Sequence, residues 1–147
     1  MDLGYLLFSL EDNDTSIAYG ALKELEALSD TSNVLYSHMN EFISMIDSEK
    51  YVMRVRGFRL FCKQAKWDND NIIDSNLDSA LNILSDEKPT AVRQALAALH
   101  DIVLYKKNLH GQIRRRVLEI DYLKYKDTMH SLIAKDIEDL LKAMDKS

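Results

Sequence analysis

The feature that most constrains this chain is an internal repeat. When the sequence is shifted by 38 residues, Val34-Leu35 falls on Ile72-Ile73, and the polar turn Asp47-Ser48-Glu49-Lys50 falls on Ser85-Asp86-Glu87-Lys88. Apolar spacing and turn chemistry therefore agree in one register. A period in the high thirties, with two helices in each unit, is typical of helical-repeat solenoids.

Apolar residues recur at helical spacing through most of the chain, which has one proline, four glycines and no alternating stretch typical of a strand. The predicted fold class is therefore all-α. The first ten residues are too apolar to be exposed, and we expect a short helix or an extended arm there. The spacing predicts further helices over residues 17–29, 34–46, 51–66, 72–84, 89–105, 109–123 and from 127 onward.

Length and composition predict a single domain over residues 1–147. A chain of 147 residues with 46% apolar and 29% charged residues can bury a core without disulfides or metals. Its apolar runs are too short to span a bilayer, and its first ten residues carry an acid but no base, unlike a signal peptide. With Cys62 as the lone cysteine, we expect a cytoplasmic protein.

The stretch after the second repeated turn shows how the helices begin. Pro89 stands where a helix tolerates a missing N–H, and Val92, Leu96 and Leu99 then form an apolar stripe. Asp86 precedes this helix, and Arg93 follows Val92 one turn into it. This arrangement resembles the HEAT-repeat pattern, and the chain is similar to small bacterial HEAT-like or armadillo-like proteins, often labelled SufBD-like.

The resemblance implies a right-handed α-solenoid of about three antiparallel helix pairs, closed by a C-terminal capping helix. It implies a non-catalytic scaffold that holds a partner protein on a concave face, with no cofactor. It also implies structural roles for Asp86, Pro89, Val92 and Arg93, since in that family the turn acid and the arginine commonly bond between neighbouring repeats. Arg56 stands in the weaker copy of the pattern and takes the same expectation.

A basic strip is the strongest candidate for partner binding. Four bases at intervals of three, four and three residues lie along one side of the helix predicted over 51–66, and an aromatic residue ends the strip: Arg56, Arg59, Lys63, Lys66 and Trp67. Such a strip suits an acidic protein segment or a phosphate backbone. The alternative function is therefore a small nucleic-acid-binding HEAT-like protein that uses this strip.

Net charge weighs against the nucleic-acid alternative. The chain carries −5 overall; residues 1–50 hold ten acids and two bases, giving −8, and residues 51–147 hold fourteen acids and seventeen bases, giving +3. Phosphate binding depends on clustered Lys and Arg, so this acidic chain could bind nucleic acid only through a local basic face.

Enzymatic readings have weak support, and we expect no catalytic activity. No acid and aromatic pair flanks the basic strip as a HEAT-like DNA glycosylase would require. His100-Asp101 matches two residues of the HD phosphohydrolase metal pair, with His38 and Asp127 as conceivable further ligands. We expect no metal there, and His100 is predicted to be a partly buried, hydrogen-bonded histidine beside the apolar stripe.

The closing helix, from Asp127, is strongly amphipathic, and its apolar edge is formed by Ile137, Leu141 and Met144. The expectation is that this edge is buried against the preceding helix. If it is uncovered, it would suit self-association. The predicted state is a monomer or a weak homodimer with a protein partner and no membrane contact.

Overall fold

A computed structural model describes residues 2–146, and in this range the chain is all-helical, without strands. The all-α prediction is confirmed. Short 3₁₀ turns join or extend several of the eight α-helices, which are α1 (Leu3–Ser9), α2 (Thr15–Thr31), α3 (Met39–Ile46), α4 (Tyr51–Lys63), α5 (Ile72–Ala80), α6 (Pro89–Tyr105), α7 (His110–Leu118) and α8 (Asp127–Asp145).

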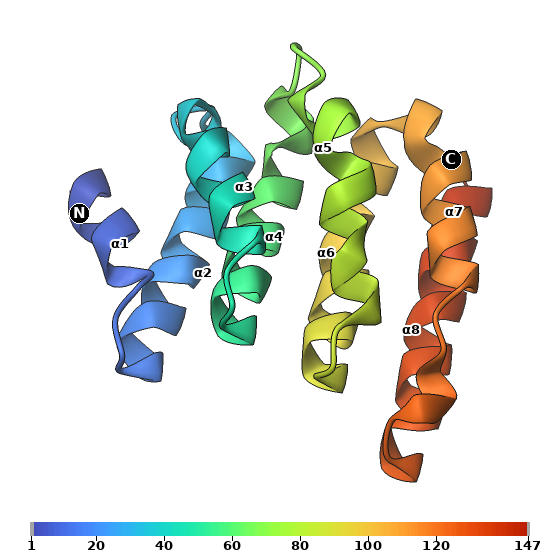
Figure 1. The fold of residues 1–147 in the computed structure, drawn as a ribbon. Helices are drawn as coiled ribbons and strands as arrows, with labels where there is room; N and C mark the ends of the chain where they lie inside the picture. Colours follow the sequence, from blue (N-terminus) through green and yellow to red (C-terminus); the bar gives the residue numbers. More distant parts are fainter. Residues whose placement is uncertain (1, 147) are drawn as a thin grey trace.

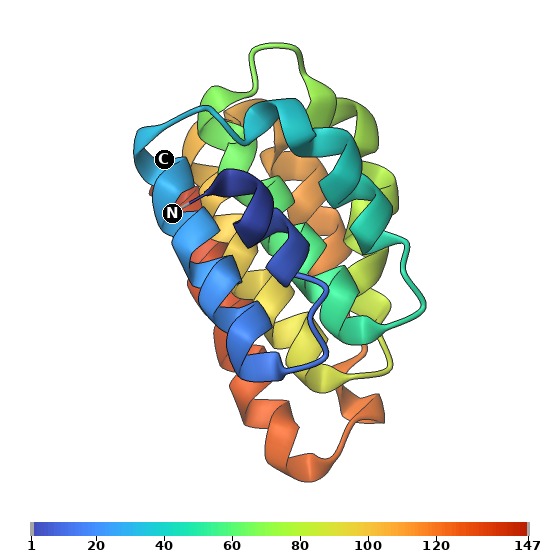
Figure 2. The same ribbon diagram turned by 90° about the vertical axis from the view of Figure 1, so that its left-hand side faces the viewer.

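Helices α2, α4, α6 and α8 contact one another in that order and form one layer. The remaining helices lie against this layer: α1 packs on α2, α3 on α4 and α7 on α8, while α5 contacts both α3 and α4. Figure 1 shows the helices following one another across the molecule from α1 to α8. Seen from the α1 end in Figure 2, α2, α6 and α8 lie toward one side, and α3 and α5 toward the other.

The repeated polar turns occupy corresponding places in this arrangement. The first, over residues 47–50, leads from α3 into α4, and the second, over residues 85–88, leads from the α5 segment into α6. Each turn therefore leads into a helix of the layer formed by α2, α4, α6 and α8. Of the two forms expected for the start of the chain, a short helix or an extended arm, the structure shows the short helix α1, and Asp2 caps it by accepting a hydrogen bond from the amide of Tyr5.

Four predicted helices are shorter in the structure, because their ends tighten or unwind. The helix predicted over 51–66 ends at Lys63 and is followed by the 3₁₀ turn Gln64–Trp67. The segment predicted over 34–46 begins with the 3₁₀ turn Tyr36–His38, and the segment predicted over 72–84 ends in the 3₁₀ turn Leu81–Ser85. Helix α7 ends at Leu118, five residues before its predicted end at Leu123. Such tight turns are common at helix ends, where backbone groups have no partner in the next turn.

One continuous core lies between the layers, and the apolar stripes identified in the sequence face into it. Leu96 is 1% exposed, and Val92 and Leu99 are fully buried, as their spacing predicts. Cys62 is also fully buried, and burial, with lesser contributions from Asp101 and Glu26, raises the pKa of its thiol well above the ordinary value. A buried thiol of raised pKa is a packing residue and not a nucleophile.

Helices α3 and α4 approach each other most closely at Gly57. A Cβ placed on Gly57 would lie 2.6 Å from the Cβ of Met45 and 2.7 Å from the carbonyl oxygen of Phe42. The backbone of α4 therefore touches α3 directly, which requires glycine at this position. Over residues 2–146, no helix is both long and apolar enough to cross a membrane.

Candidate functional site

The structure brings the predicted basic strip together. Arg56, Arg59 and Lys63 lie on α4, and Lys66 and Trp67 lie in the 3₁₀ turn Gln64–Trp67 that follows it. The strip faces the neighbouring helix α2, so most of its polar groups meet partners from the same chain.

Arg59 is held by both neighbours of α4. Its Nε and Nη2 donate to the carboxylate of Glu26 on α2 at 2.9 and 2.7 Å, and its Nη1 donates to Oε1 of Gln94 on α6 at 2.9 Å. The guanidinium also lies over the ring of Tyr19, 5.8 Å from the ring centre. Burial would lower the pKa of Arg59, but the hydrogen bonds and charge of Glu26 raise it overall. Arg59 therefore joins α2, α4 and α6.

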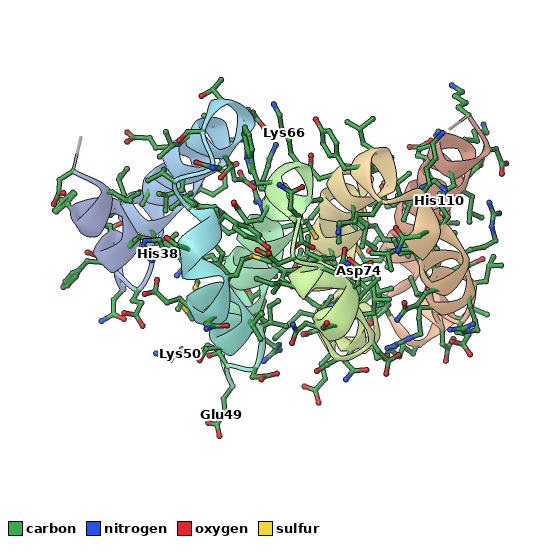
Figure 3. The ribbon with its side chains drawn as sticks, turned by 90° about the horizontal axis from the view of Figure 1, so that it is seen from above. His38, Glu49, Lys50, Lys66, Asp74 and His110 are labelled. Carbon is green, nitrogen blue, oxygen red and sulfur yellow. The ribbon has the colours of Figure 1, made fainter. Side chains whose placement is uncertain are left out.

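The far end of the strip is bonded to the last turn of α2. Lys63 forms an ion pair with Asp30 at 3.1 Å, and the ammonium of Lys66 donates to the Asp30 carbonyl at 2.6 Å. The indole N–H of Trp67 donates to the Ser29 carbonyl at 2.8 Å. Seen from above in Figure 3, Lys66 projects on the α2 side of the molecule. Lys66 and Trp67 therefore satisfy carbonyls at the end of α2, where a helix leaves them without partners.

Sequence reasoning missed the acids that neutralise this strip. Glu26 and Asp30 stand four residues apart on α2, so they share one face of that helix, and this face meets the bases of α4. The signal in the sequence was the excess of acids in residues 1–50 opposite the base-rich helix. The pairing turns most of the strip into an interface between two helices of the same chain.

Arg56 differs from the rest of the strip. It is only 8% exposed, and its Nη1 donates to the Leu10 carbonyl at 2.7 Å and lies 3.5 Å from the sulfur of Met53. Burial lowers the pKa of Arg56. Within residues 2–146, the structure gives this guanidinium no carboxylate partner. A buried positive charge thus stands next to α1 with no carboxylate of the described residues bonded to it, although Glu11, Asp12 and Glu49 line the same hollow.

Three hollows lie side by side along α4, and we call them together the α4 trough. The first lies between the segment leading into α2 and the turn leading into α4, and the other two lie between α2 and α6. The three volumes are about 730, 270 and 320 Å³. The first two share Thr15, Val52 and Arg56, and the last two share the hydrogen-bonded pair Arg59 and Gln94, so neighbouring hollows adjoin. Its walls and floor further include Tyr19, Leu22, Lys23 and Glu26 of α2, Tyr51, Val55 and Lys63 of α4, and Ala97, Ala98 and Asp101 of α6.

The turn acid Asp86 bonds to the preceding helix through a different arginine from the one expected. Arg54, and not Arg56, donates its Nε–H to Asp86 at 2.8 Å, while the other carboxylate oxygen of Asp86 accepts from the Lys88 amide at 3.0 Å. The Tyr125 hydroxyl also donates to the Asp86 carbonyl. Arg56 lies on the other side of α4 from Arg54, because two residues along a helix turn the side chain by about 200°.

The other residues of the predicted repeat pattern have structural surroundings. Pro89 occupies the first turn of α6, and Val92 is buried. Arg93 donates to Asp136 of α8 with Nε at 2.7 Å and Nη2 at 3.3 Å, and this hydrogen bonding raises the pKa of Arg93. Arg93 therefore joins α6 to α8 as Arg59 joins α4 to α2.

A second polar cluster, which sequence reasoning did not identify, lies where the loop between α4 and α5 meets the C-terminal end of α6. Lys106, 8% exposed, pairs with Asp68 at 3.0 Å and with Asp74 at 2.9 Å, and the Tyr36 hydroxyl donates to Asp68 at 2.7 Å. Asp68 also accepts from the amides at the start of α5. Figure 3 shows Asp74 on α5 near this end. The cluster ties three loops together, and Lys106, together with neutral donors, binds its two carboxylates.

Histidine and acid residues do not gather into a metal site in the part of the chain that the structure describes. His100 is exposed, contrary to the partly buried, hydrogen-bonded histidine that we expected, because its place at the edge of the stripe of Leu96 and Val103 leaves it open to solvent. Asp101 faces the α4 trough, 3.8 Å from Lys63. His38 instead bonds to Glu41 at 2.9 Å.

The apolar edge of the closing helix packs against the core. Met144 is buried, and Ile137 and Leu141 are half-buried against core residues. Helix α8 contacts α6 and α7, so this edge is covered within the chain.

Comparison with models of known protein families, with curated proteins and with solved structures gives no match to this chain. The HEAT-like or armadillo-like resemblance therefore stays a prediction from the sequence.

Proposed function

We propose that this chain is a non-catalytic α-solenoid of antiparallel helix pairs, of the HEAT-like or armadillo-like kind, which holds a partner protein in the α4 trough. The observation that carries the proposal is the row of three adjoining hollows along α4, the last two of which have α2 on one side and α6 on the other. An elongated surface of this kind suits an extended protein segment.

The composition of the trough supports a protein partner. It combines paired charges, the tyrosines Tyr19 and Tyr51, and the small residues Ala97 and Ala98. Aromatic residues and arginine are enriched where proteins bind one another, and small side chains let a partner backbone approach closely. The paired charges would supply a polar rim.

The alternative, a nucleic-acid-binding protein, has less support. Binding to a phosphate backbone draws on Lys and Arg side chains that are free to release counterions. In this structure Arg59 pairs with Glu26, and Lys63 with Asp30. We therefore expect no binding of duplex DNA even at low ionic strength. Salt-dependent binding that weakens steeply as salt rises would favour the alternative.

Oligomeric state and location follow the same proposal. We propose a monomer or weak homodimer, since the apolar edge of α8 is covered by the chain's own helices. We propose a cytoplasmic location, because the lone cysteine fits a reducing compartment.

Site-directed photo-crosslinking in native cells tests the trough as the binding face. A photoreactive residue is placed at Lys23 or Ala97, which are exposed and line the trough, and at Ser79 on α5 or Gly111 on α7, which are exposed elsewhere. The proposal predicts the same crosslinked protein from both trough positions and its absence from both control positions. Equal crosslinking from all four positions would contradict it.

A further inference from the structure

We propose that the α4 trough recognises a carboxylate side chain of its partner, an Asp or Glu next to an apolar residue, and that Arg56 binds this carboxylate. The inference rests on the proposed function, because it names the chemistry that the trough selects. It begins with the charge balance of α4.

Arg56 forms no ion pair within the described residues 2–146. The neighbouring bases Arg59 and Lys63 have carboxylate partners, whereas Arg56 contacts the carbonyl of Leu10 and the sulfur of Met53. Burying a charge is unfavourable unless it is paired. A guanidinium has five N–H donors, and the Leu10 carbonyl accepts from Nη1 alone. The Nε and Nη2 groups remain available for a ligand.

These free donors belong to a side chain that lines the trough. Arg56 borders both the largest hollow and the 270 Å³ hollow next to it. The smaller hollow has an apolar floor of Leu22, Val52 and Val55, and no acidic residue lines it. It therefore joins an apolar surface to a guanidinium that has no ion pair within the described residues, which suits a carboxylate beside an apolar side chain. Carboxylates match the planar donor fork of arginine with two parallel hydrogen bonds.

The charges around Arg56 favour a single carboxylate over a polyanion as the ligand. Glu11, Asp12 and Glu49 line the adjoining large hollow. A row of phosphates passing Arg56 would come near these acids, within the screening length of about 8 Å at physiological salt. One carboxylate held at Arg56 avoids most of that repulsion. Duplex or single-stranded nucleic acid therefore fits the site poorly.

The shape of the trough favours a side chain within a continuous segment over a chain terminus or a small molecule. Hollows adjoin the Arg56 hollow on both sides, so a peptide can enter and leave. The 270 Å³ hollow is also smaller than the roughly 300–1,000 Å³ of pockets that enclose drug-sized ligands. It has room for one or two side chains.

Nuclear magnetic resonance of the full chain tests this inference with defined probes. The probes are a capped heptapeptide with a central Leu-Glu-Leu, its Leu-Gln-Leu counterpart, and inorganic phosphate. We expect the Glu peptide to shift the Arg56 Nε–H signal and the amides of Val52 and Val55 in a saturable way. We expect the Gln peptide to bind about tenfold more weakly, because it cannot accept charge-assisted hydrogen bonds.

Two variants complete the test. Arg56→Gln should abolish the preference for the Glu peptide, whereas Arg115→Gln, which changes an exposed arginine on α7, should keep it. Circular dichroism and thermal melting check that both variants fold. If Arg56→Gln does not fold, the comparison of the Glu and Gln peptides on the unaltered chain still shows whether the trough prefers a carboxylate.

Three results that differ from this expectation would overturn the inference, and they can be told apart. Equal binding of both peptides along the trough would refute the role of Arg56 and leave the proposed function standing. Shifts confined to residues outside the trough, or no saturable shift, would refute the carboxylate site. Tighter binding of phosphate than of the Glu peptide would show that the site selects phosphate instead.

Discussion

Arg59 of α4 and Glu26 of α2 form a salt bridge with two parallel hydrogen bonds, of 2.9 and 2.7 Å, and their side chains are only 15% and 12% exposed. Since water screens this pair poorly, loss of one partner leaves a nearly buried charge. We expect Arg59→Met to lower the free energy of unfolding by about 3 kcal/mol. Urea denaturation measures this change.

A double-mutant cycle checks that the pair itself is responsible. Arg59→Met combined with Glu26→Met should be less destabilised than Arg59→Met alone, because neither charge is then left unpaired. Strictly additive effects of the two substitutions would show that Arg59 and Glu26 contribute independently.

Gly57 offers a test of the close approach between α3 and α4. Gly57→Ala places a Cβ 2.6 Å from the Cβ of Met45, so the helices must separate. We expect it to destabilise the protein by about 1–3 kcal/mol, as overpacking does, although alanine is the better helix former. Thermal melting of the purified variant measures the effect.

Gly20 supplies the matched control, since a Cβ there meets no atom within 4 Å. Gly20→Ala on α2 should stabilise the protein by roughly 0.5–1 kcal/mol through helix propensity alone. Destabilisation by both alanines would mean that Gly57 is not held by a specific contact.

The division of α6 and α7 into inner and outer faces makes a third prediction. Leu96 is 1% exposed, so Leu96→Ala should cost about 2–5 kcal/mol of stability by leaving a cavity. Arg115 is exposed, and Arg115→Ala should change stability by less than about 0.5 kcal/mol. Chemical denaturation of both variants would show equal midpoints if the assigned faces were wrong.

Asp68 makes the stability sensitive to acid. Burial raises the pKa of this carboxyl, but hydrogen bonds from Tyr36, from Lys106 and from the amides of Ile73 and Ile72 outweigh burial and lower it overall. A lowered pKa in the folded state contributes stability above the unfolded value of about 3.9. That contribution is lost as the pH falls through the folded pKa.

Asp68→Asn should therefore be less stable than the unaltered chain by about 2 kcal/mol above pH ~5, because Lys106 loses one partner. The difference between the two proteins should begin to shrink below pH ~4, where Asp68 becomes protonated in the unfolded chain, and should vanish only below the lowered pKa of Asp68 in the folded state. Urea denaturation across this pH range provides the measurement. A difference that stays constant with pH would contradict the assignment.

The sequence was informative where local chemistry decides the structure. Helical spacing predicted the all-α class and the buried face of α6, and the turn before Pro89 predicted where α6 begins. These features depend on residues within one or two turns of each other. Helix ends were less predictable, since the 3₁₀ turn Leu81–Ser85 depends on packing against α6.

Contacts between distant residues were not predictable from spacing. The basic strip was recognised, but its partners Glu26 and Asp30 lie more than 30 residues away, and periodicity does not identify which helix faces which. The Asp68–Lys106 pair was missed for the same reason, because loop residues and helix-end bases usually stay in water. Arg56 was grouped with the strip, and only the packing of α1 against α2 distinguishes it.

The central claim is that the α4 trough holds the partner, and a binding measurement tests it most directly. Once photo-crosslinking identifies the partner, its affinity is measured by calorimetry for the unaltered chain, for Ala97→Arg in the trough and for Ser79→Arg on α5. Both side chains are exposed, so neither change disturbs the core. We predict that Ala97→Arg weakens binding at least about tenfold, near 1.4 kcal/mol, while Ser79→Arg leaves it unchanged. Unchanged affinity for Ala97→Arg, or equal loss for both variants, would contradict the claim.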